Sequence, residues 1–305
     1  MIKSPGTVRV GTAGWEHEVF NECLYPRNLR ESSDKLSYYA QFFDTVEVRH
    51  TFWDDAIDAE EARRWIQAVA PNKRFRFNLK LHSSFTHRRQ IAPGAATRVR
   101  ALLQELAKGD RLGALVAQFP FCFTNTSAHR YHLLRLGELF RGFPVHVELR
   151  HNSWDQPWLL SFLAEQGLHP VSVDLPRLRQ FIPFITGVTG EHAYIRAHGR
   201  NEKGWLLNGI DVRYDYLYND REVRELMRRI HSLLLKCSEV TMICNNTTGG
   251  KALANALQLT GALRDDKRML IPQATAQAFP FLKGSVCEQE VDQTLFTAGE
   301  LREAV

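Results

Sequence analysis

The stretch VHVELRHNSWDQPWLLSFLAEQGLHPVSVD, residues 145–174, contains one complete unit of strand, helix and strand. Val145–Arg150 and Pro170–Asp174 have the short, β-rich composition of strands. The amphipathic segment between them, Gln156–Gln166, stops at Gly167, a residue typical of helix C-termini. Two strands joined through a helix run parallel, with a right-handed crossover. The unit therefore predicts a parallel α/β fold.

The same alternation extends over most of the chain. The predicted strands are Val8–Ala13, Thr45–Arg49, Phe75–His82, Ala114–Phe119, Val145–Arg150, Pro170–Asp174, Ala193–His198 and Val240–Asn245. Eight strands alternating with helices predict a (β/α)8 TIM barrel. A doubly wound open sheet is the main alternative, but no Gly-x-Gly-x-x-Gly follows the first strand, which disfavours its dinucleotide-binding version.

We expect one barrel domain over residues 1–269. Residues 270–305 would form a C-terminal extension that packs on the barrel or on a partner subunit.

Composition narrows the classes of protein. The chain has 305 residues, 44% of them hydrophobic, and no run of about 18 apolar residues that would predict a membrane span. Its five cysteines are scattered without a Cys-x-x-Cys pair, which favours a reducing compartment, and we expect a cytoplasmic protein. A net charge of +5 is mildly basic, so nucleic acid is an alternative partner that composition alone does not favour.

Polar and apolar residues alternate within the predicted strands. In Val145–Arg150, the apolar Val145, Val147 and Leu149 alternate with polar residues, and three further strands share this pattern. Side chains alternate faces along a strand, so the apolar set should meet the helices and the polar set should line a polar barrel interior. For the sixth strand we place Ser172 and Asp174 inside. The expected polar residues toward the C-terminal rim are Glu47, Arg49, Lys80, His82, Gln118, Glu148, Arg150, Asp174, Arg196, His198 and Asn245.

Positive charge exceeds negative charge among these residues. Carboxylates can neutralise only some of the arginines and the lysine, and a buried charge without a partner costs on the order of several kcal/mol. The surplus predicts a small anionic ligand at the C-terminal mouth of the barrel. The alternative is an internal salt-bridge network that only fills the barrel.

Short motifs give the chain a family resemblance. From about Val8 to Leu263 the chain resembles the YecE-like proteins, the domain of unknown function 72 family, because these motifs occur in the family's order: Gly11-Thr-Ala-Gly-Trp15, Val46-Glu47, Thr51-Phe52, Phe77 to Lys80, Thr86-His87, Gln118-Phe119-Pro120, Glu148-Leu-Arg-His151 with Ser153-Trp154, Arg196-Ala-His-Gly199 and Asn245-Asn246. The resemblance implies a (β/α)8 barrel with a site but names no reaction. Where members usually have Asn-Ser-Thr-Phe-Tyr, this chain has Arg49-His50-Thr51-Phe52-Trp53, which adds basic groups at the rim.

These residues favour an enzyme that uses acid–base chemistry on a phosphorylated or carboxylated, sugar-like substrate, as a hydrolase, lyase or isomerase. The candidate catalytic residues are Glu47, Glu148, His198 and Asp174. The candidate ligand-binding residues are Trp15, Arg49, Lys80, His82, Gln118, Arg150, Trp154, Arg196, Asn245 and Asn246. For Glu148, acting as a base beside His198 or His82 and orienting Arg150 or Arg196 stand as equal alternatives.

Three questions stay open from the sequence. No cofactor is predicted, and a divalent metal remains an alternative because the carboxylates and histidines are suitable ligands, although no His-Glu-x-x-His spacing occurs. An endonuclease-like barrel that processes nucleic acid and a non-catalytic, anion-binding regulatory barrel are the other candidate functions. The oligomeric state does not follow from the sequence.

Overall fold

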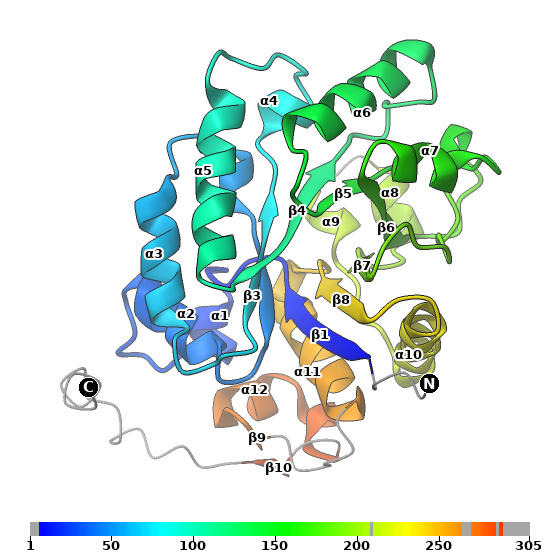
Figure 1. Ribbon diagram of the computed structural model, residues 1–305. Coiled ribbons are helices and arrows are strands. Elements are labelled where there is room, and N and C mark those ends of the chain that lie inside the picture. Colours follow the sequence, from blue (N-terminus) through cyan, green and yellow to red (C-terminus); the bar gives the residue numbers. More distant parts are fainter. Residues whose placement is uncertain (1–5, 208–209, 264–269, 285–286, 289–305) are drawn as a thin grey trace, which may run out of the picture.

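Eight parallel strands form a nearly closed barrel in the computed structural model, which describes residues 6–207, 210–263, 270–284 and 287–288 (Figure 1). Their order around the sheet is β1-β8-β7-β6-β5-β4-β3-β2. The strands are β1 (Thr7–Thr12), β2 (Thr45–Val48), β3 (Arg76–Lys80), β4 (Leu112–Gln118), β5 (Val145–Glu148), β6 (Leu168–Asp174), β7 (His192–Ala197) and β8 (Glu239–Cys244). The predicted TIM-barrel fold is confirmed.

Helices surround the strands and short helical turns occupy several loops. The α-helices are α1 (Phe20–Cys23), α2 (Ser32–Tyr39), α3 (Ala59–Ala68), α4 (Ser83–Thr86), α5 (Ala95–Lys108), α6 (Ser127–Leu139), α7 (Leu159–Glu165), α8 (Glu202–Leu206), α9 (Ile210–Arg213), α10 (Asp220–Leu234), α11 (Lys251–Leu263) and α12 (Gln273–Ala278). The 3-10 turns are η1 (His50–Phe52), η2 (Asn152–Trp154), η3 (Thr248–Gly250) and η4 (Pro280–Gly284). Local sequence explains where helices begin: the Asp58 side chain caps α3, and Asn219 forms a capping box with Glu222 at α10.

The barrel closes where β1 meets β2. The two strands share a parallel bridge between Ala13 and Glu47. Beside it, the Tyr39 hydroxyl of α2 accepts a hydrogen bond from the Thr12 backbone N–H (2.9 Å) and donates one to the Thr45 carbonyl (3.2 Å). Gly11 allows this approach, because a Cβ there would lie 2.1 Å from the Thr45 carbonyl oxygen. A side chain from α2 therefore satisfies backbone groups at the seam.

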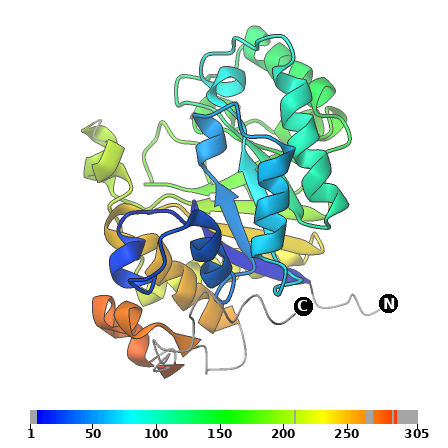
Figure 2. The same ribbon diagram turned by 90° about the vertical axis from the view of Figure 1, so that its left-hand side faces the viewer.

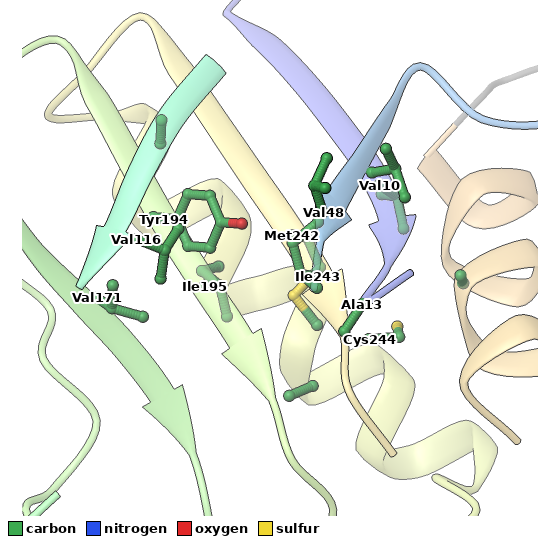
Figure 3. Packing of buried hydrophobic residues seen from close by; sticks show 14 of the residues in the cluster. Val10, Ala13, Val48, Val116, Val171, Tyr194, Ile195, Met242, Ile243 and Cys244 are labelled. Carbon is green, nitrogen blue, oxygen red and sulfur yellow. The ribbon is translucent and has the colours of Figure 1, made fainter. Parts of the chain in front are cut away.

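Strand register decides which side chains face the barrel interior. Val171 pairs with Tyr194 and Val173 with Arg196. Tyr194 and Arg196 both reach Glu47 on β2, so they point into the barrel, and their neighbours on β6 must do the same. In Figure 3 the Tyr194 hydroxyl is directed toward β2.

The predicted inward position of Asp174 is therefore wrong. Asp174 pairs with Ala197, on the face of the sheet that meets the helices. The sequence alternates on β6 as it does on other strands, but here the polar set faces outward because Arg229 of α10 supplies a charged partner for Asp174 on the helix side. Alternation alone cannot tell which of two faces is the inner one.

The segment after α11 packs at the edge of the barrel. Within residues 270–284, Ile271, Ala276 and Leu282 are buried, and the Thr275 hydroxyl donates to the Cys23 carbonyl at the end of α1. Figure 2 shows this orange segment beside the blue α1. A two-stranded parallel sheet joins β9 (Leu270–Ile271) and β10 (Cys287–Glu288). Residues 289–305, the rest of the predicted extension, lie outside the described residues, and the predicted boundary at residue 269 stays a prediction.

No helix among the described residues combines the length and the apolar character that crossing a bilayer would require.

Candidate functional site

Arg196 is the centre of a charged network inside the barrel. This side chain extends inward from β7, where its Nη2 donates to Glu47 Oε1 (2.7 Å) and its Nη1 donates to Glu148 Oε2. The Tyr194 hydroxyl donates to the other oxygen of Glu47 (3.1 Å). All four side chains are fully buried or nearly so. The network therefore ties β2, β5 and β7 together across the barrel.

Glu148 is the most constrained carboxylate in this network. Its Oε1 accepts a hydrogen bond from Arg150 Nε (2.6 Å), and its Oε2 accepts one from Arg196. Burial alone would raise the pKa of Glu148, but the charges of Arg196 and Arg150 outweigh burial and hold the pKa well below its usual range. The carboxylate is therefore ionised and pairs with both arginines, the arrangement in which Glu148 orients them.

His198 and Asn245 stand beside the carboxylate. His198 Nε2 lies 3.2 Å from Glu148 Oε1, and the Asn245 amide donates to His198 Nδ1 (2.8 Å). Burial lowers the pKa of His198 to about 4, despite the opposing charge of Glu148. The imidazole is therefore neutral at physiological pH, and with Nδ1 accepting, its proton sits on Nε2, facing Glu148.

Lys80 differs from Arg150 and Arg196 because, among the described residues, its amine has no carboxylate partner. Lys80 is the last residue of β3 and its side chain is half-buried. Its Nζ lies 4.0 Å from the centre of the Phe52 ring. Within the described chain, Nζ makes no hydrogen bond and has no carboxylate within 4.0 Å. Burial, and after it the charge of Arg196, lower the pKa of Lys80 to about 7. Protonated and neutral amine are thus both present near neutral pH.

Two arginines lie toward the rim of the barrel. Arg49 Nη1 lies 3.2 Å from His17 Nε2, and the Arg49 guanidinium lies 5.6 Å from the ring centre of Trp53, which is 62% exposed. The Arg150 guanidinium lies 5.3 Å from the ring centre of Trp205 on α8. Figure 2 shows the yellow-green segment with α8 and α9 projecting from the barrel. Both guanidinium groups are stacked against aromatic rings and stay charged.

The structure thus brings together most of the predicted site. Glu47, Glu148, Arg49, Lys80, Arg150, Arg196, His198 and Asn245 are connected by the contacts and electrostatic interactions above. Gln118 lies opposite Glu148 in the register of β4 and β5, and its amide donates to the Phe119 carbonyl (2.7 Å).

Asp174 belongs to a separate cluster on the helix side. Its carboxylate accepts hydrogen bonds from Arg200 Nε (2.8 Å) and Nη2 (2.7 Å), from Arg229 of α10 and from the Tyr218 hydroxyl (2.8 Å). Four donors saturate this carboxylate, and its outward direction separates it from Glu47 and Glu148. Its predicted placement with the catalytic carboxylates is wrong.

Four other predicted residues make contacts within the fold. Trp15 is 1% exposed and packs in the core, and Trp154 is buried with its Nε1 donating to the Phe123 carbonyl (2.7 Å). His82 Nδ1 is hydrogen-bonded to the Ser84 hydroxyl (2.9 Å). The Asn246 amide donates to the Tyr216 carbonyl (2.8 Å). These placements assign structural contacts to the four side chains, and their predicted contacts with a ligand remain predictions.

Sequence reasoning missed two residues of the site. The His87 ring centre lies 4.9 Å from that of Phe52, the ring that the Lys80 amine also contacts. Burial, followed by the charge of Lys80, lowers the pKa of His87 to about 4. Tyr214 lies 5.9 Å from the His198 ring, centre to centre. His87 belongs to the motif Thr86-His87, and Tyr214 lies in a long loop after a strand. Their position in loops that follow strands is the sequence feature that could have indicated them as site residues.

No group of three or more His, Cys, Asp or Glu side chains in the described ranges is arranged to hold a metal ion.

Comparison with known proteins shows the family of this barrel. A family model described as "Protein of unknown function DUF72" matches residues 9–278. The chain belongs to the DUF72 family. The UPF0759 protein YunF of Bacillus subtilis (strain 168) is 27% identical over 289 residues, which cover 87% of this chain and 98% of YunF. The family resemblance predicted from the sequence motifs is therefore confirmed.

Solved structures of DUF72 family proteins share the fold. One from Thermotoga maritima MSB8 has a TM-score of 0.74 and 32% identity, covering 84% of this chain and 98% of the other. One from Enterococcus faecalis V583 has a TM-score of 0.73 and 28% identity, covering 84% of this chain and 95% of the other. The matched DUF72 region contains the charged network and continues into α12.

Proposed function

We propose that this DUF72 protein is an enzyme that acts on a small anionic, sugar-like substrate, phosphorylated or carboxylated, at the C-terminal mouth of its barrel. The observation that carries the proposal is the imbalance of charge in the network. Glu47 and Glu148 are both paired with Arg196. In the described chain, Lys80 and Arg49 have no carboxylate within 4.0 Å.

The outward position of Asp174 increases the imbalance of charge inside the barrel. Without Asp174, the carboxylates Glu47 and Glu148 share the interior with four cationic groups, Arg49, Lys80, Arg150 and Arg196. A substrate anion would supply the missing negative charge, and a fork-shaped guanidinium and an ammonium group both suit phosphate or carboxylate. The mouth of a TIM barrel is where loops after the strands form active sites.

Proton transfer is assigned to groups other than the predicted carboxylates. Glu148 is occupied by two arginines and His198 is fully buried, so these side chains hold the site in place. Lys80 and His87 are half-buried, and both titrate below their usual range, Lys80 with a pKa of about 7 and His87 with a pKa of about 4. A group whose pKa lies near the working pH transfers protons most efficiently, which favours Lys80.

Anion binding can be tested with Lys80→Met, because this substitution removes an amine that has no hydrogen-bond or ion-pair partner among the described residues. We expect inorganic phosphate and phosphorylated or carboxylated sugars to raise the Tm of the full chain. In Lys80→Met the affinity should be about ten-fold lower or weaker still, since a hydrogen bond to a charged group contributes about 1.5–3 kcal/mol. Without ligand the variant should be at least as stable as the parent.

Lys108→Met is the matched control, because Lys108 is exposed on α5 with only a 3.9 Å ion pair to Glu105. It should retain the full response to ligand. The proposal fails if no small anion raises the Tm, or if Lys80→Met responds as strongly as Lys108→Met.

Nucleic acid is a second candidate ligand, favoured by one observation. Trp53 is 62% exposed and stacks beside Arg49, a combination that suits an unpaired base next to a phosphate. Binding of a labelled single-stranded oligonucleotide should then weaken steeply with salt, with a slope that follows the number of phosphate contacts. A Trp53→Ala variant that binds the oligonucleotide as tightly as the parent would remove this candidate.

A non-catalytic, anion-binding barrel is the third candidate. The saturated hydrogen bonding of Glu148 favours it, because a carboxylate held by two arginines is a structural group. Turnover separates it from the enzyme: a ligand that binds in a Lys80-dependent way and is recovered chemically unchanged over a long incubation supports the binding barrel.

A further inference from the structure

We infer that Lys80 is a nucleophilic amine that forms an imine with its substrate, so that the substrate is an anionic aldehyde or ketone. This inference rests on the proposed function for the place where the substrate binds. It goes further by naming the reacting group and the chemical class of the substrate. It also narrows the reaction to the lyase and isomerase classes, because hydrolysis does not require an imine.

The Lys80 side chain lies on the inner face of the barrel. Asn78, two residues earlier on β3, pairs with the inward-facing Glu47 of β2, so Asn78 and Lys80 both point inward. Nζ lies against the flat face of Phe52 at 4.0 Å and makes no hydrogen bond in the described part of the chain. Its lone pair, once the amine is neutral, is therefore not engaged by another protein group.

The charges around Lys80 favour a neutral amine. Arg196 and Arg150 repel the protonated form, while Glu47 and Glu148 attract it. Both carboxylates are already hydrogen-bonded to Arg196, which limits the attraction that they offer to Lys80. Together with burial, this arrangement lowers the pKa of Lys80 to about 7, so that neutral amine is available at physiological pH.

The arginines cannot act as nucleophilic amines in this way. Arg196 donates through Nη1 and Nη2 to two carboxylates, and a guanidinium stays protonated at any physiological pH. Arg49 and Arg150 would hold the anionic group of the substrate, leaving the amine free for the carbonyl. The site therefore contains a cationic part for binding and one amine for reaction.

The chemical step balances without any other reagent. The neutral amine attacks the carbonyl carbon, a C–N bond forms, and an amine proton moves to the oxygen. The resulting carbinolamine takes up one proton and loses its hydroxyl as water, which leaves a protonated imine. The positive nitrogen then withdraws electrons from the neighbouring carbon, so that removal of a proton or cleavage of a C–C bond there becomes easier. Nothing is oxidised or reduced.

His87 is positioned to move the protons in these steps. Its ring and the Lys80 amine both contact the Phe52 side chain. The His87 ring centre lies 4.9 Å from the Phe52 ring centre, and the Lys80 Nζ lies 4.0 Å from that same centre. The pKa of His87, lowered by burial and by Lys80 to about 4, leaves the imidazole neutral and able both to accept and to donate a proton.

Borohydride trapping tests the imine directly. The full chain is incubated separately with pyridoxal 5′-phosphate, dihydroxyacetone phosphate and pyruvate, which are anionic carbonyl compounds, and then reduced with sodium borohydride. Intact mass and peptide mapping should place the added mass on Lys80 for at least one probe. Lys108→Met should be labelled at Lys80 as the parent is, because Lys108 is a surface lysine outside the site.

Two variants at position 80 separate reaction from binding. Lys80→Met should lose the trapped adduct. Lys80→Arg keeps a cation in the same place but has no nucleophilic amine, so it should retain stabilisation by phosphate and lose the adduct. Trapping should increase with pH to a plateau above a midpoint near 7, whereas labelling of surface lysines should keep rising toward their usual pKa of about 10.4.

The outcomes distinguish this inference from the proposed function. If phosphate stabilises the parent in a Lys80-dependent way but none of the three probes is trapped on Lys80, the proposed function stands and the imine is wrong. If label appears only on surface lysines, equally in the parent and in Lys80→Met, the imine is also wrong. If neither phosphate nor any probe interacts with Lys80, both fail together.

Discussion

The carboxylate of Glu148 shows how much a single residue depends on its partners. In the sequence it resembles a catalytic base beside a histidine, but the structure surrounds it with Arg150 at 2.6 Å and with Arg196. Such a carboxylate stabilises the arginines that it touches and in turn keeps its own charge. The neighbouring amine of Lys80, with no such partner in the described chain, is the group left for chemistry.

Replacing Glu148 should therefore affect folding before it affects chemistry. Glu148→Gln leaves Arg150 without its carboxylate and Arg196 with Glu47 alone, so we expect a loss of about 3–5 kcal/mol in the free energy of unfolding, measured by urea denaturation. Glu138→Gln removes one half of a surface pair with Arg135 (3.4 Å) and should cost no more than about 1 kcal/mol. Equal stabilities for the two variants would show that the buried network contributes little.

Among the elements, the seam between β1 and β2 is the least regular part of the barrel. The strands meet at one bridge, and the hydroxyl of Tyr39, on α2, connects the Thr12 N–H with the Thr45 carbonyl. A helix therefore completes the hydrogen bonding of a sheet. Buried backbone groups need such partners, because an unpaired one costs about 1–3 kcal/mol.

Tyr39→Phe should reveal this dependence. The substitution keeps the ring and removes the hydroxyl, so we expect the free energy of unfolding to fall by about 1–3 kcal/mol. Tyr38→Phe is the control, since the buried Tyr38 hydroxyl makes no hydrogen bond with any part of the chain that the structure describes. Hydrogen exchange of the Thr12 amide should also accelerate in Tyr39→Phe alone. Unchanged exchange there would mean that the hydroxyl does not protect the seam.

At the scale of the whole molecule, the barrel interior contains histidines that are buried and neutral. His146 is fully buried and its pKa lies well below 6.5, because burial and then His192 and His169 disfavour the charged form. Burial lowers the pKa values of His192 and His198 to about 4. Because these interior histidines are uncharged in the folded protein, the free energy of unfolding should depend on pH.

Stability should fall as the pH is lowered from about 6.5 toward 4. In that window the unfolded chain binds protons at these histidines and the folded chain does not, so protons favour unfolding. The contribution is fully present above the unfolded pKa and is lost as the pH falls through the window. Urea midpoints measured at about pH 7 and about pH 5 should show the decrease.

His146→Phe is the matching variant for this pH dependence. Neither ring nitrogen of His146 has a hydrogen-bond partner among the described residues, so phenylalanine should cost little at neutral pH. The variant should lose less stability than the parent between the two pH values. A decrease as large as that of the parent would assign the effect to other groups.

The strand and helix pattern of the sequence predicted the barrel and placed several charged residues of the strands together inside it. Strand and helix periodicities are local, and the C-terminal ends of parallel strands necessarily meet at one face, which brings Glu47, Glu148 and Arg196 together whatever their exact contacts. Charge counting along these strands is the basis of the predicted anionic ligand, which stays a prediction.

The pairing of the charges and the inner face of β6 depend on long-range contacts in the folded barrel. Arg196 and Glu47 are 149 residues apart, and their 2.7 Å contact depends on the closure of the whole barrel. Asp174 faces outward because of Arg229, 55 residues away on α10. Alternation within a strand defines two faces without naming the inner one, and pairing depends on distances that no local pattern contains. For the same reason, the amine of Lys80 stands out only once the partners of Arg150, Arg196 and the two carboxylates are known.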